Sequence, residues 1–147
     1  MKLDDKSASM ALFREKCKMH DLRITPQRIV VYQELLKSKD HPSAEVLFQR
    51  VRNIIPDISL DTVNRTLLTF SKIGIIHIVE GYGEARRFDP DIENHHHFRC
   101  VNCNSIIDFE YKPYDDIIVP GDLKKRFTVL DKKVLLEGYC DKCRMDK

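Results

Sequence analysis

Four cysteines are arranged as two closely spaced pairs, Cys100 with Cys103 and Cys140 with Cys143, with residues 104–139 between them. Each C-x2-C turn can bring two thiolates to one ion at about 2.3 Å, and two such turns complete a tetrahedron. A shell of four thiolates leaves no position for a substrate, so the pattern predicts a structural Zn²⁺. The alternative is two reactive dithiols. It is disfavoured because neither pair opens a helix in a thioredoxin-like βαβ context.

A fifth cysteine, Cys17, is far from these pairs in the sequence. It follows Met10 and Phe13 at helical spacing on an apolar face. This pattern predicts a buried core cysteine rather than a metal ligand.

Three consecutive histidines, residues 95–97, precede the first cysteine pair. In a strand, alternation puts His95 and His97 on one face and His96 on the other. Imidazole nitrogens together with carboxylate oxygens suit divalent iron, manganese or zinc. From the residues alone, two interpretations remain open: a second metal site, or a histidine-rich surface strand.

Two aspartates are candidates to complete such a site. Asp108 lies across the hairpin expected from residues 97–101 and 105–109, and Asp89 lies at the junction of the two halves of the chain. Spacing does not establish which of them joins the histidines.

The composition is that of an ordinary globular chain. It has 147 residues, of which 42% are hydrophobic, enough for one domain or two small ones. No apolar run approaches the roughly 18 residues of a membrane span, and residues 1–21 are too charged for a signal peptide. We therefore expect a cytoplasmic protein with no membrane partner, in which cysteines stay reduced. The net charge of +2 does not by itself indicate nucleic-acid binding.

The first half of the chain shows four helical patterns. Residues 9–20 form the first, and Thr25 and Pro26 begin a second that runs to about Ser38. The third follows Ser43, carries apolar Leu47, Val51 and Ile54, and is ended by Pro56. The fourth follows Ser59, with Leu60, Val63, Leu67 and Phe70 on one face and Gly74 at its end.

A predicted β-hairpin follows these helices. Residues 75–80 and 84–88 are its strands, Gly81-Tyr82-Gly83 is its turn, and Arg86 and Arg87 lie on the return strand. Helices followed by a basic hairpin are typical of a winged helix-turn-helix.

In that fold the helix before the wing enters the DNA major groove. There Arg65 could contact guanine and Asn64 adenine, with Thr62 and Lys72 on phosphates. The other interpretation is a solvated polar face, which every amphipathic helix has. Two exposed arginines on a hairpin are likewise usually only a solvated strand.

Five segments occur in an order that is more specific than any one of them: residues 23–28 (RITPQR), 41–45 (HPSAE), 59–67 (SLDTVNRTL), 87–89 (RFD) and 95–103 (HHHFRCVNC). In this order and spacing they resemble the ferric uptake regulator (Fur) family of bacterial metal-dependent repressors, over nearly the whole chain. The resemblance implies an α+β fold. Residues 1–88 would form a winged helix-turn-helix DNA-binding domain, and a hinge would join it to a small α/β dimerisation and metal-binding domain, residues 89–147.

The resemblance also implies ligands and partners. The positions that match the family's regulatory site, which would hold Fe²⁺ or Mn²⁺, are His41, Asp89, His95, His97 and Asp108. The expected partners are a second copy of the chain and a palindromic double-stranded DNA operator. Besides the fourth helix, the resemblance implies DNA contacts by Arg23, Gln27 and Arg28.

The two aspartates indicate a branch of the family. Iron sensors tend to have glutamate at the positions of Asp89 and Asp108, whereas peroxide-responsive, PerR-like members tend to have aspartate at both. In the implied peroxide chemistry, iron(II) keeps a coordination position open for hydrogen peroxide. Oxidation of His41 or His95 then removes a ligand, and the repressor loses its metal and its DNA.

The chain departs from the family pattern at several positions. Most members have tyrosine at the position of Asn64, and Arg65 is the residue usual in iron sensors. Pro120 and Gly121 interrupt the expected dimerisation-domain helix, which should be short or broken. Strands at 127–131 and 133–139 are still expected to pair.

A further metal site of many iron sensors maps onto Asn94, His96, Asp115 and Lys132. Asparagine and lysine are poor metal ligands, so we expect this site to be absent or degenerate and His96 to lie at the surface.

Three other functions compete with peroxide sensing. An iron-responsive repressor is favoured by Arg65 and opposed by Asp108. A zinc-dependent hydrolase or deaminase is disfavoured because a deaminase needs H-x-E followed by P-C-x-x-C, and Arg99 stands in place of that proline. We therefore expect no enzyme. The third alternative is a zinc-ribbon module for protein interaction, which leaves the winged-helix half of the chain without a function.

Overall fold

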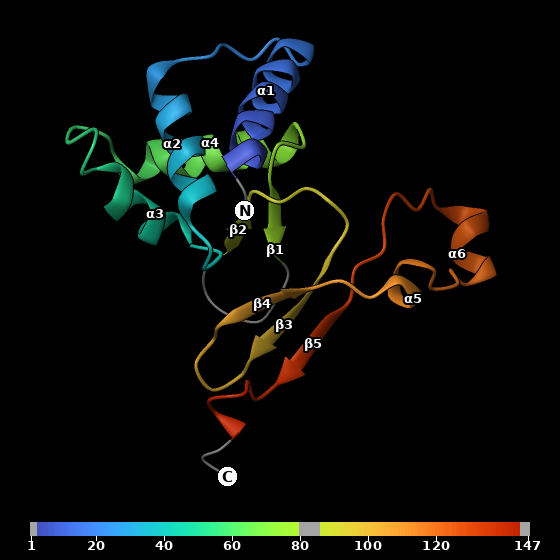
Figure 1. Cartoon of the computed structure of the whole chain (residues 1–147). Helices are drawn as coiled ribbons and strands as arrows, with labels where there is room; N and C mark the ends of the chain where they lie inside the picture. The colour runs from blue at the N-terminus through green and yellow to red at the C-terminus, as the bar shows by residue number, and fades with distance from the viewer. Residues whose placement is uncertain (1–2, 80–85, 145–147) are drawn as a thin grey trace. The chain divides into compact units, whose positions relative to one another are not determined.

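The computed structural model describes residues 3–79 and 86–144, and the chain divides into two compact units, Met1–Ile92 and Glu93–Lys147 (Figure 1). The boundary expected after residue 88 falls inside strand β2 (Arg87–Asp89), which pairs with β1 (His77–Val79) of the first unit. Asp89 therefore belongs to the first unit.

Four helices precede this strand pair in the first unit: α1 (Leu3–Met19), α2 (Pro26–Lys37), α3 (Ala44–Val51) and α4 (Leu60–Lys72). The predicted caps are confirmed, since Thr25, Ser43 and Ser59 each accept a hydrogen bond from a backbone N–H in the first turn of the helix that follows. Gly74, at φ 82°, ends α4. The N–H of Ile75 donates to the carbonyl of Phe70, which is the hydrogen bond of a Schellman motif.

Some helix limits differ from the sequence prediction. Helix α1 begins at Leu3 rather than at residue 9. Helix α3 ends at Val51, and Ile54, expected on its apolar face, is exposed in the turn that follows. The predicted hairpin turn, Gly81-Tyr82-Gly83, lies outside the described residues.

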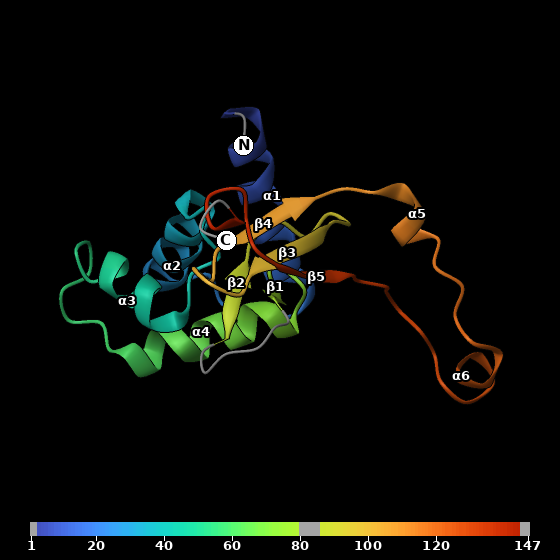
Figure 2. The ribbon, with the colours of Figure 1, turned by 90° about the horizontal axis from the view of Figure 1, so that it is seen from below.

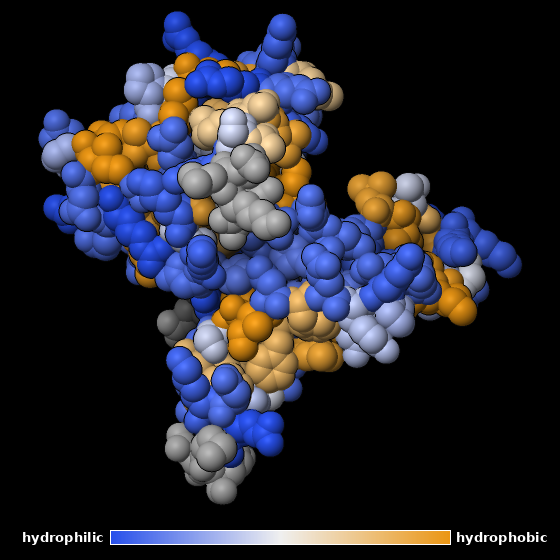
Figure 3. Space-filling model, in the orientation of Figure 1, coloured by the Kyte–Doolittle hydropathy of each residue, from blue (hydrophilic) through white to orange (hydrophobic). Residues whose placement is uncertain are grey.

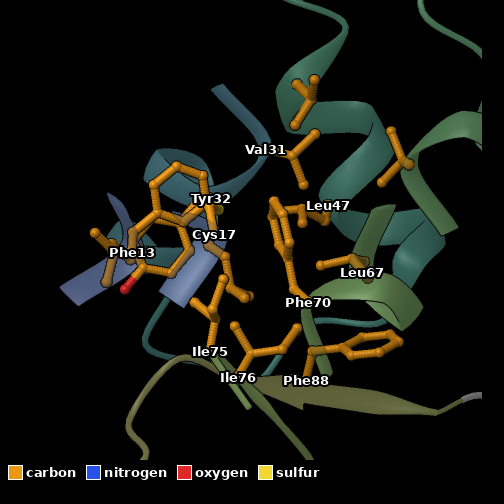
Figure 4. Packing of buried hydrophobic residues seen from close by; sticks show 14 of the residues in the cluster. Phe13, Cys17, Val31, Tyr32, Leu47, Leu67, Phe70, Ile75, Ile76 and Phe88 are labelled. Atoms are coloured by element: carbon orange, nitrogen blue, oxygen red, sulfur yellow. The ribbon is translucent and has the colours of Figure 1, made fainter. Parts of the chain in front are cut away.

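The core of the first unit is built around stacked aromatic rings (Figure 4). Phe13 of α1 stacks on Tyr32 of α2 at 4.6 Å between ring centroids, and Phe70 of α4 meets Phe13 edge-on at 5.5 Å. Cys17 is fully buried in this cluster, as predicted, and burial raises the pKa of its thiol. Leu60 is partly exposed at the start of α4, so the predicted apolar face is correct only from Val63 onward.

The second unit contains a three-stranded sheet with the strand order β4-β3-β5 (Figure 2). Strand β3 (His96–Cys100) pairs antiparallel with β4 (Ile106–Phe109), with His97 opposite Asp108, and parallel with β5 (Leu135–Gly138). The predicted hairpin is thus confirmed.

Two short helices lie between β4 and β5. They are α5 (Lys112–Asp115) and α6 (Gly121–Arg126), with Pro120 as the N-cap of α6. This agrees with the expected break of the helix at Pro120 and Gly121. The predicted strand at 127–131 is wrong, because residues 127–134 form no strand and only β5 joins the sheet. No helix among the described residues has the length and apolar character needed to cross a membrane.

Candidate metal centres

The four paired cysteines come together in the second unit. Their sulfur atoms all lie within 4.8 Å of one another, and Sγ of Cys103 is 3.9 Å from Sγ of Cys140. A tetrahedron of thiolates around Zn²⁺, with bonds of about 2.3 Å, has edges of about 3.8 Å. The cluster therefore fits a structural zinc.

Backbone geometry prepares this cluster for a cation. The N–H groups of Cys103 and Cys140 point at Sγ of Cys100, at 3.5 and 3.4 Å, and they lower the pKa of Cys100 to about 6. The Asn102 amide donates to Sγ of Cys143 at 3.2 Å and favours its thiolate. The neighbouring sulfur atoms, of which that of Cys140 has the largest effect, and burial of the thiol oppose the Asn102 hydrogen bond. Together they raise the pKa of Cys143 to about 12. Gathering four thiolates here therefore requires a compensating positive charge.

The first unit brings together two of the five expected regulatory ligands. Nε2 of His41 lies 3.3 Å from Oδ2 of Asp89, and both side chains are buried. The other oxygen of Asp89 accepts the N–H of Asp91 at 2.9 Å, which fixes the orientation of the carboxylate. A histidine and an oriented carboxylate oxygen are suitable ligands for a divalent transition metal.

The second unit brings together the other three. Nε2 of His95 lies 3.1 Å from Nε2 of His97, and these nitrogens lie 3.6 and 3.2 Å from Oδ1 of Asp108. Nδ1 of His95 is 2.7 Å from the carbonyl of Glu93. Because a carbonyl only accepts, Nδ1 carries the proton, and the lone pair of Nε2 faces His97 and Asp108. Sequence reasoning missed this contribution of Glu93, which comes from its main chain and so leaves no signal in residue type.

His96 lies on the opposite face of β3 and is fully buried, so the prediction that it lies at the surface is wrong. The N–H of Val134 donates to its Nδ1 at 3.1 Å, so Nε2 carries the proton and donates to Oδ1 of Asp115 at 2.7 Å. Lys132 donates to the backbone carbonyl of Asp115 at 3.2 Å. Both nitrogens of His96 therefore have hydrogen-bond partners within the protein, and the expectation that this metal site is absent or degenerate stays a prediction.

Asp115→Asn is expected to leave the metal content of the protein unchanged, because an amide oxygen can still accept the proton of His96. Asp115→Leu removes the acceptor and leaves a buried N–H unsatisfied, which should destabilise the protein by about 1–3 kcal/mol. Elemental analysis and thermal unfolding of both variants measure these effects. Loss of one metal equivalent in Asp115→Asn would show instead that the aspartate is a ligand.

The residues expected to read bases lie on α4. Arg65 has a side chain that is 72% exposed and pairs with Asp61 at 3.0 Å. Asn64 lines a surface groove of about 520 Å³ together with Arg86, which precedes β2. Helix α4 and the residue before β2 therefore border one groove, which Glu45 and Asp61 also line, and the DNA contacts of α4 stay a prediction.

The expected phosphate contacts are divided between two regions. Thr62 is half-buried and its hydroxyl lies 2.8 Å from that of Ser59, whereas Lys72 is exposed in the last turn of α4. Arg23 and Gln27 are exposed around the start of α2. The guanidinium of Arg28 donates to the carbonyl of Arg23 at 2.7 Å.

A winged helix, a four-cysteine cluster and paired histidine and aspartate side chains in one chain together define a class of metal-binding, DNA-binding regulators. Comparison with known proteins agrees, since the model of the ferric uptake regulator family matches residues 19–136. The chain belongs to this family and is a metal-responsive repressor. Family members are transcription regulators and not enzymes, so the hydrolase or deaminase interpretation is excluded. The family match also includes the winged-helix half, so the zinc-ribbon module is excluded as well.

Relatives and solved structures support this assignment. The peroxide-responsive repressor PerR of Staphylococcus epidermidis is 32% identical over 123 residues, which cover 84% of this chain and 82% of that protein. The Campylobacter jejuni peroxide stress regulator is 27% identical, with a TM-score of 0.66 over 97% of this chain and 100% of that one. The Helicobacter pylori ferric uptake regulator Fur has the same fold, with a TM-score of 0.76 at 23% identity over 95% and 93% of the two chains.

Proposed function

We propose that this chain is a peroxide-responsive repressor. Its regulatory Fe²⁺ would be held by the histidines and aspartates of both units: His41, Asp89, His95, His97 and Asp108. The observation that carries the proposal is the pair of aspartates. Asp89 lies 3.3 Å from His41, and Asp108 lies 3.2 Å from His97, in positions where iron-sensing relatives are expected to have glutamate. The 32% identity to peroxide-responsive repressors points the same way.

These residues couple metal to DNA because they come from different units. His41 and Asp89 belong to the winged-helix unit, and His95, His97 and Asp108 to the sheet unit. Simultaneous binding of one ion by both groups would favour the arrangement of the units that fits a palindromic operator. A coupling of about 1–3 kcal/mol corresponds to roughly a 5–150-fold change in affinity, and DNA must tighten metal binding by the same factor.

The histidines also provide the means of inactivation. Hydrogen peroxide would be the two-electron oxidant: its O–O bond would break, one oxygen would be added to an imidazole ring and the other would leave as water. Bound Fe²⁺ would supply the chemistry that cleaves the O–O bond. His95 presents the lone pair of Nε2 toward Asp108 while the Glu93 carbonyl fixes its ring, so its imidazole would stay close to the oxidant. Addition of one oxygen to His95 or His41 would weaken a ligand, and the coupling between the two units would be lost.

A second copy of the chain is the proposed partner of the sheet unit. Most of the large exposed apolar side chains among the described residues lie in this unit, and Figure 3 shows apolar surface over its sheet and helices. Ile118 is 87% exposed and Leu130 is 91% exposed. Strand β5 is an edge of the sheet, and an edge can pair with its own copy across a two-fold axis. Pairing in a dimer would also give a strand partner to residues 127–131, for which the described part of one chain provides none.

The alternative is an iron-responsive repressor, favoured by the exposed Arg65 on α4. One experiment separates the two functions. Zinc-containing protein is loaded with Fe²⁺ or Mn²⁺ without oxygen, and an operator is selected from random duplex DNA with the Mn²⁺ form. Peroxide is then added while DNA binding and the masses of the peptides bearing His41 and His95 are measured.

Peroxide sensing predicts that the iron form alone releases DNA, with affinity falling roughly 5–150-fold and a one-oxygen mass gain on one of these peptides. The manganese form is the control and should stay bound and unmodified. An iron form that stays bound and unmodified, while its DNA affinity follows the iron concentration, would refute peroxide sensing in favour of iron sensing.

A further inference from the structure

His41 adopts a backbone conformation that residues other than glycine rarely take. Its φ is 52°, in the left-handed region, at a point between the C-cap of α2, Ser38, and the N-cap of α3, Ser43. Such a conformation persists where the surrounding structure holds it in place. The contacts that hold this loop therefore decide where the His41 imidazole points.

Arg87 of β2 makes the most direct of these contacts. Its Nη2 donates to the carbonyl of Asp40 at 2.6 Å and its Nε donates to the carbonyl of His41, so one guanidinium holds two consecutive peptide groups. The N–H of Phe88 donates to the carbonyl of Pro42 at 3.0 Å. The two residues of β2 that precede Asp89 thus hydrogen-bond to the loop of residues 40–42. Asp89 itself faces His41.

Arg50 braces the same loop from the last turn of α3. Its Nη1 and Nη2 bind the Asp40 carboxylate at 3.0 and 2.7 Å, and Nη1 also lies 2.7 Å from Oγ of Ser38. The Ser38 hydroxyl donates to the carbonyl of Glu34 at 2.8 Å.

We propose that Arg87 is a positioning residue for the metal ligand His41, with the pair formed by Arg50 and Asp40 bracing the loop. The inference rests on the proposed regulatory site. Because Arg87 holds the His41 carbonyl and stands two residues before Asp89, it brings the two ligands together before metal binds. Its Nε and Nη2 are turned onto the loop carbonyls, whereas the neighbouring Arg86 is exposed. Sequence alone had suggested a solvated wing arginine at both positions.

The test compares Arg87→Ala with Arg86→Ala, which remove the same charge from adjacent positions. Operator binding of the full-length zinc-containing protein is followed by fluorescence anisotropy while Mn²⁺ is titrated. For Arg87→Ala the Mn²⁺ midpoint should rise roughly 10–100-fold, the range found for residues that orient metal ligands. Its DNA affinity at saturating Mn²⁺, and the salt dependence of that affinity, should match the wild type. Because Arg86 borders the groove assigned to DNA, Arg86→Ala is compared by its Mn²⁺ affinity in the absence of operator, which should match the wild type.

Asp40→Asn is a second test of the inference that still applies if Arg87→Ala fails to fold. The Asp40 side chain is more than half exposed, so its replacement should leave folding intact. Asp40→Asn should raise the Mn²⁺ midpoint in the same direction by a smaller factor. Weaker DNA binding by Arg87→Ala at saturating Mn²⁺, with a reduced salt slope and an unchanged midpoint, would make Arg87 a phosphate contact and overturn the inference. A lower melting temperature with unchanged midpoints in both variants would also overturn it. Wild-type operator binding that ignores Mn²⁺ would instead overturn the proposed function itself, and this inference with it.

Discussion

Cys100→Ser is expected to abolish zinc retention, dimer formation and operator binding together. Cys100 is the buried last residue of β3, and its backbone N–H donates to the carbonyl of Ser105 at 2.9 Å. It also pairs with Gly138 of β5. Cys100 is therefore a member of the metal cluster and also contacts both neighbours of β3 in the sheet. Structural zinc supplies about 10–16 kcal/mol in zinc-finger peptides. This is comparable to the whole stability of a typical domain, about 5–15 kcal/mol.

Loss of the zinc should also disturb the positions of the proposed regulatory ligands, because β3 connects them to the cysteine cluster. His97 lies on this strand and His95 immediately before it, and the N–H of His97 donates to the carbonyl of Val134 at 3.2 Å. Once β3 loses its anchor at Cys100, the spacing of His95, His97 and Asp108 is no longer fixed. In this proposal the zinc would stabilise the strand that carries the regulatory histidines and would not itself be the sensor.

Elemental analysis, sedimentation velocity and operator binding measure the three effects. Cys17→Ala is the matched control, since it also removes one buried thiol, but from the core of the first unit. It should keep zinc, dimer and metal-dependent DNA binding, with a modest loss of thermal stability. A Cys100→Ser protein that remains dimeric and binds its operator would show that the sheet unit does not depend on its zinc.

Local signals in the sequence were sufficient for most of the winged-helix unit. Thr25, Ser43 and Ser59 cap helices through hydrogen bonds to residues three positions away, and Gly74 ends α4 within one turn. The cysteine pairs were equally readable, because each turn depends on four consecutive residues. Interactions of short sequence separation leave their mark on residue type and spacing.

Features that depend on residues far apart in the chain could not be predicted from the sequence. Burial of His96 depends on Asp115 and Val134, which no periodicity links to it. Arg87 was assigned to an exposed strand face, yet its guanidinium turns toward the loop of His41, 46 residues earlier in the sequence. Alternation along a strand gives the side of the sheet and not the contact that a long side chain makes.

The predicted strand at 127–131 failed for a related reason, and it leads to the second large effect. Phe127 and Leu130 are 55% and 91% exposed in the single chain, and their segment has no strand partner there. β-propensity describes how well side chains fit a half-buried sheet surface, so it predicts a strand only where such a surface is completed. We expect the second copy of the chain to complete it.

Phe127→Asp combined with Leu130→Asp should therefore convert the dimer to a monomer. Burial of a large apolar side chain contributes about 1.5–3 kcal/mol, and a two-fold axis would bury each residue twice. Even half of that total would raise the dissociation constant of the dimer by about 10²–10⁴. Sedimentation equilibrium measures this constant, and Met19→Asp, which places a charge on a 68% exposed apolar side chain of the first unit, is the control. The double variant should keep its zinc, because the cysteine cluster lies within one chain, yet lose tight operator binding, because a monomer reaches only one half-site. A dimer of unchanged stability would exclude residues 127–130 from the interface.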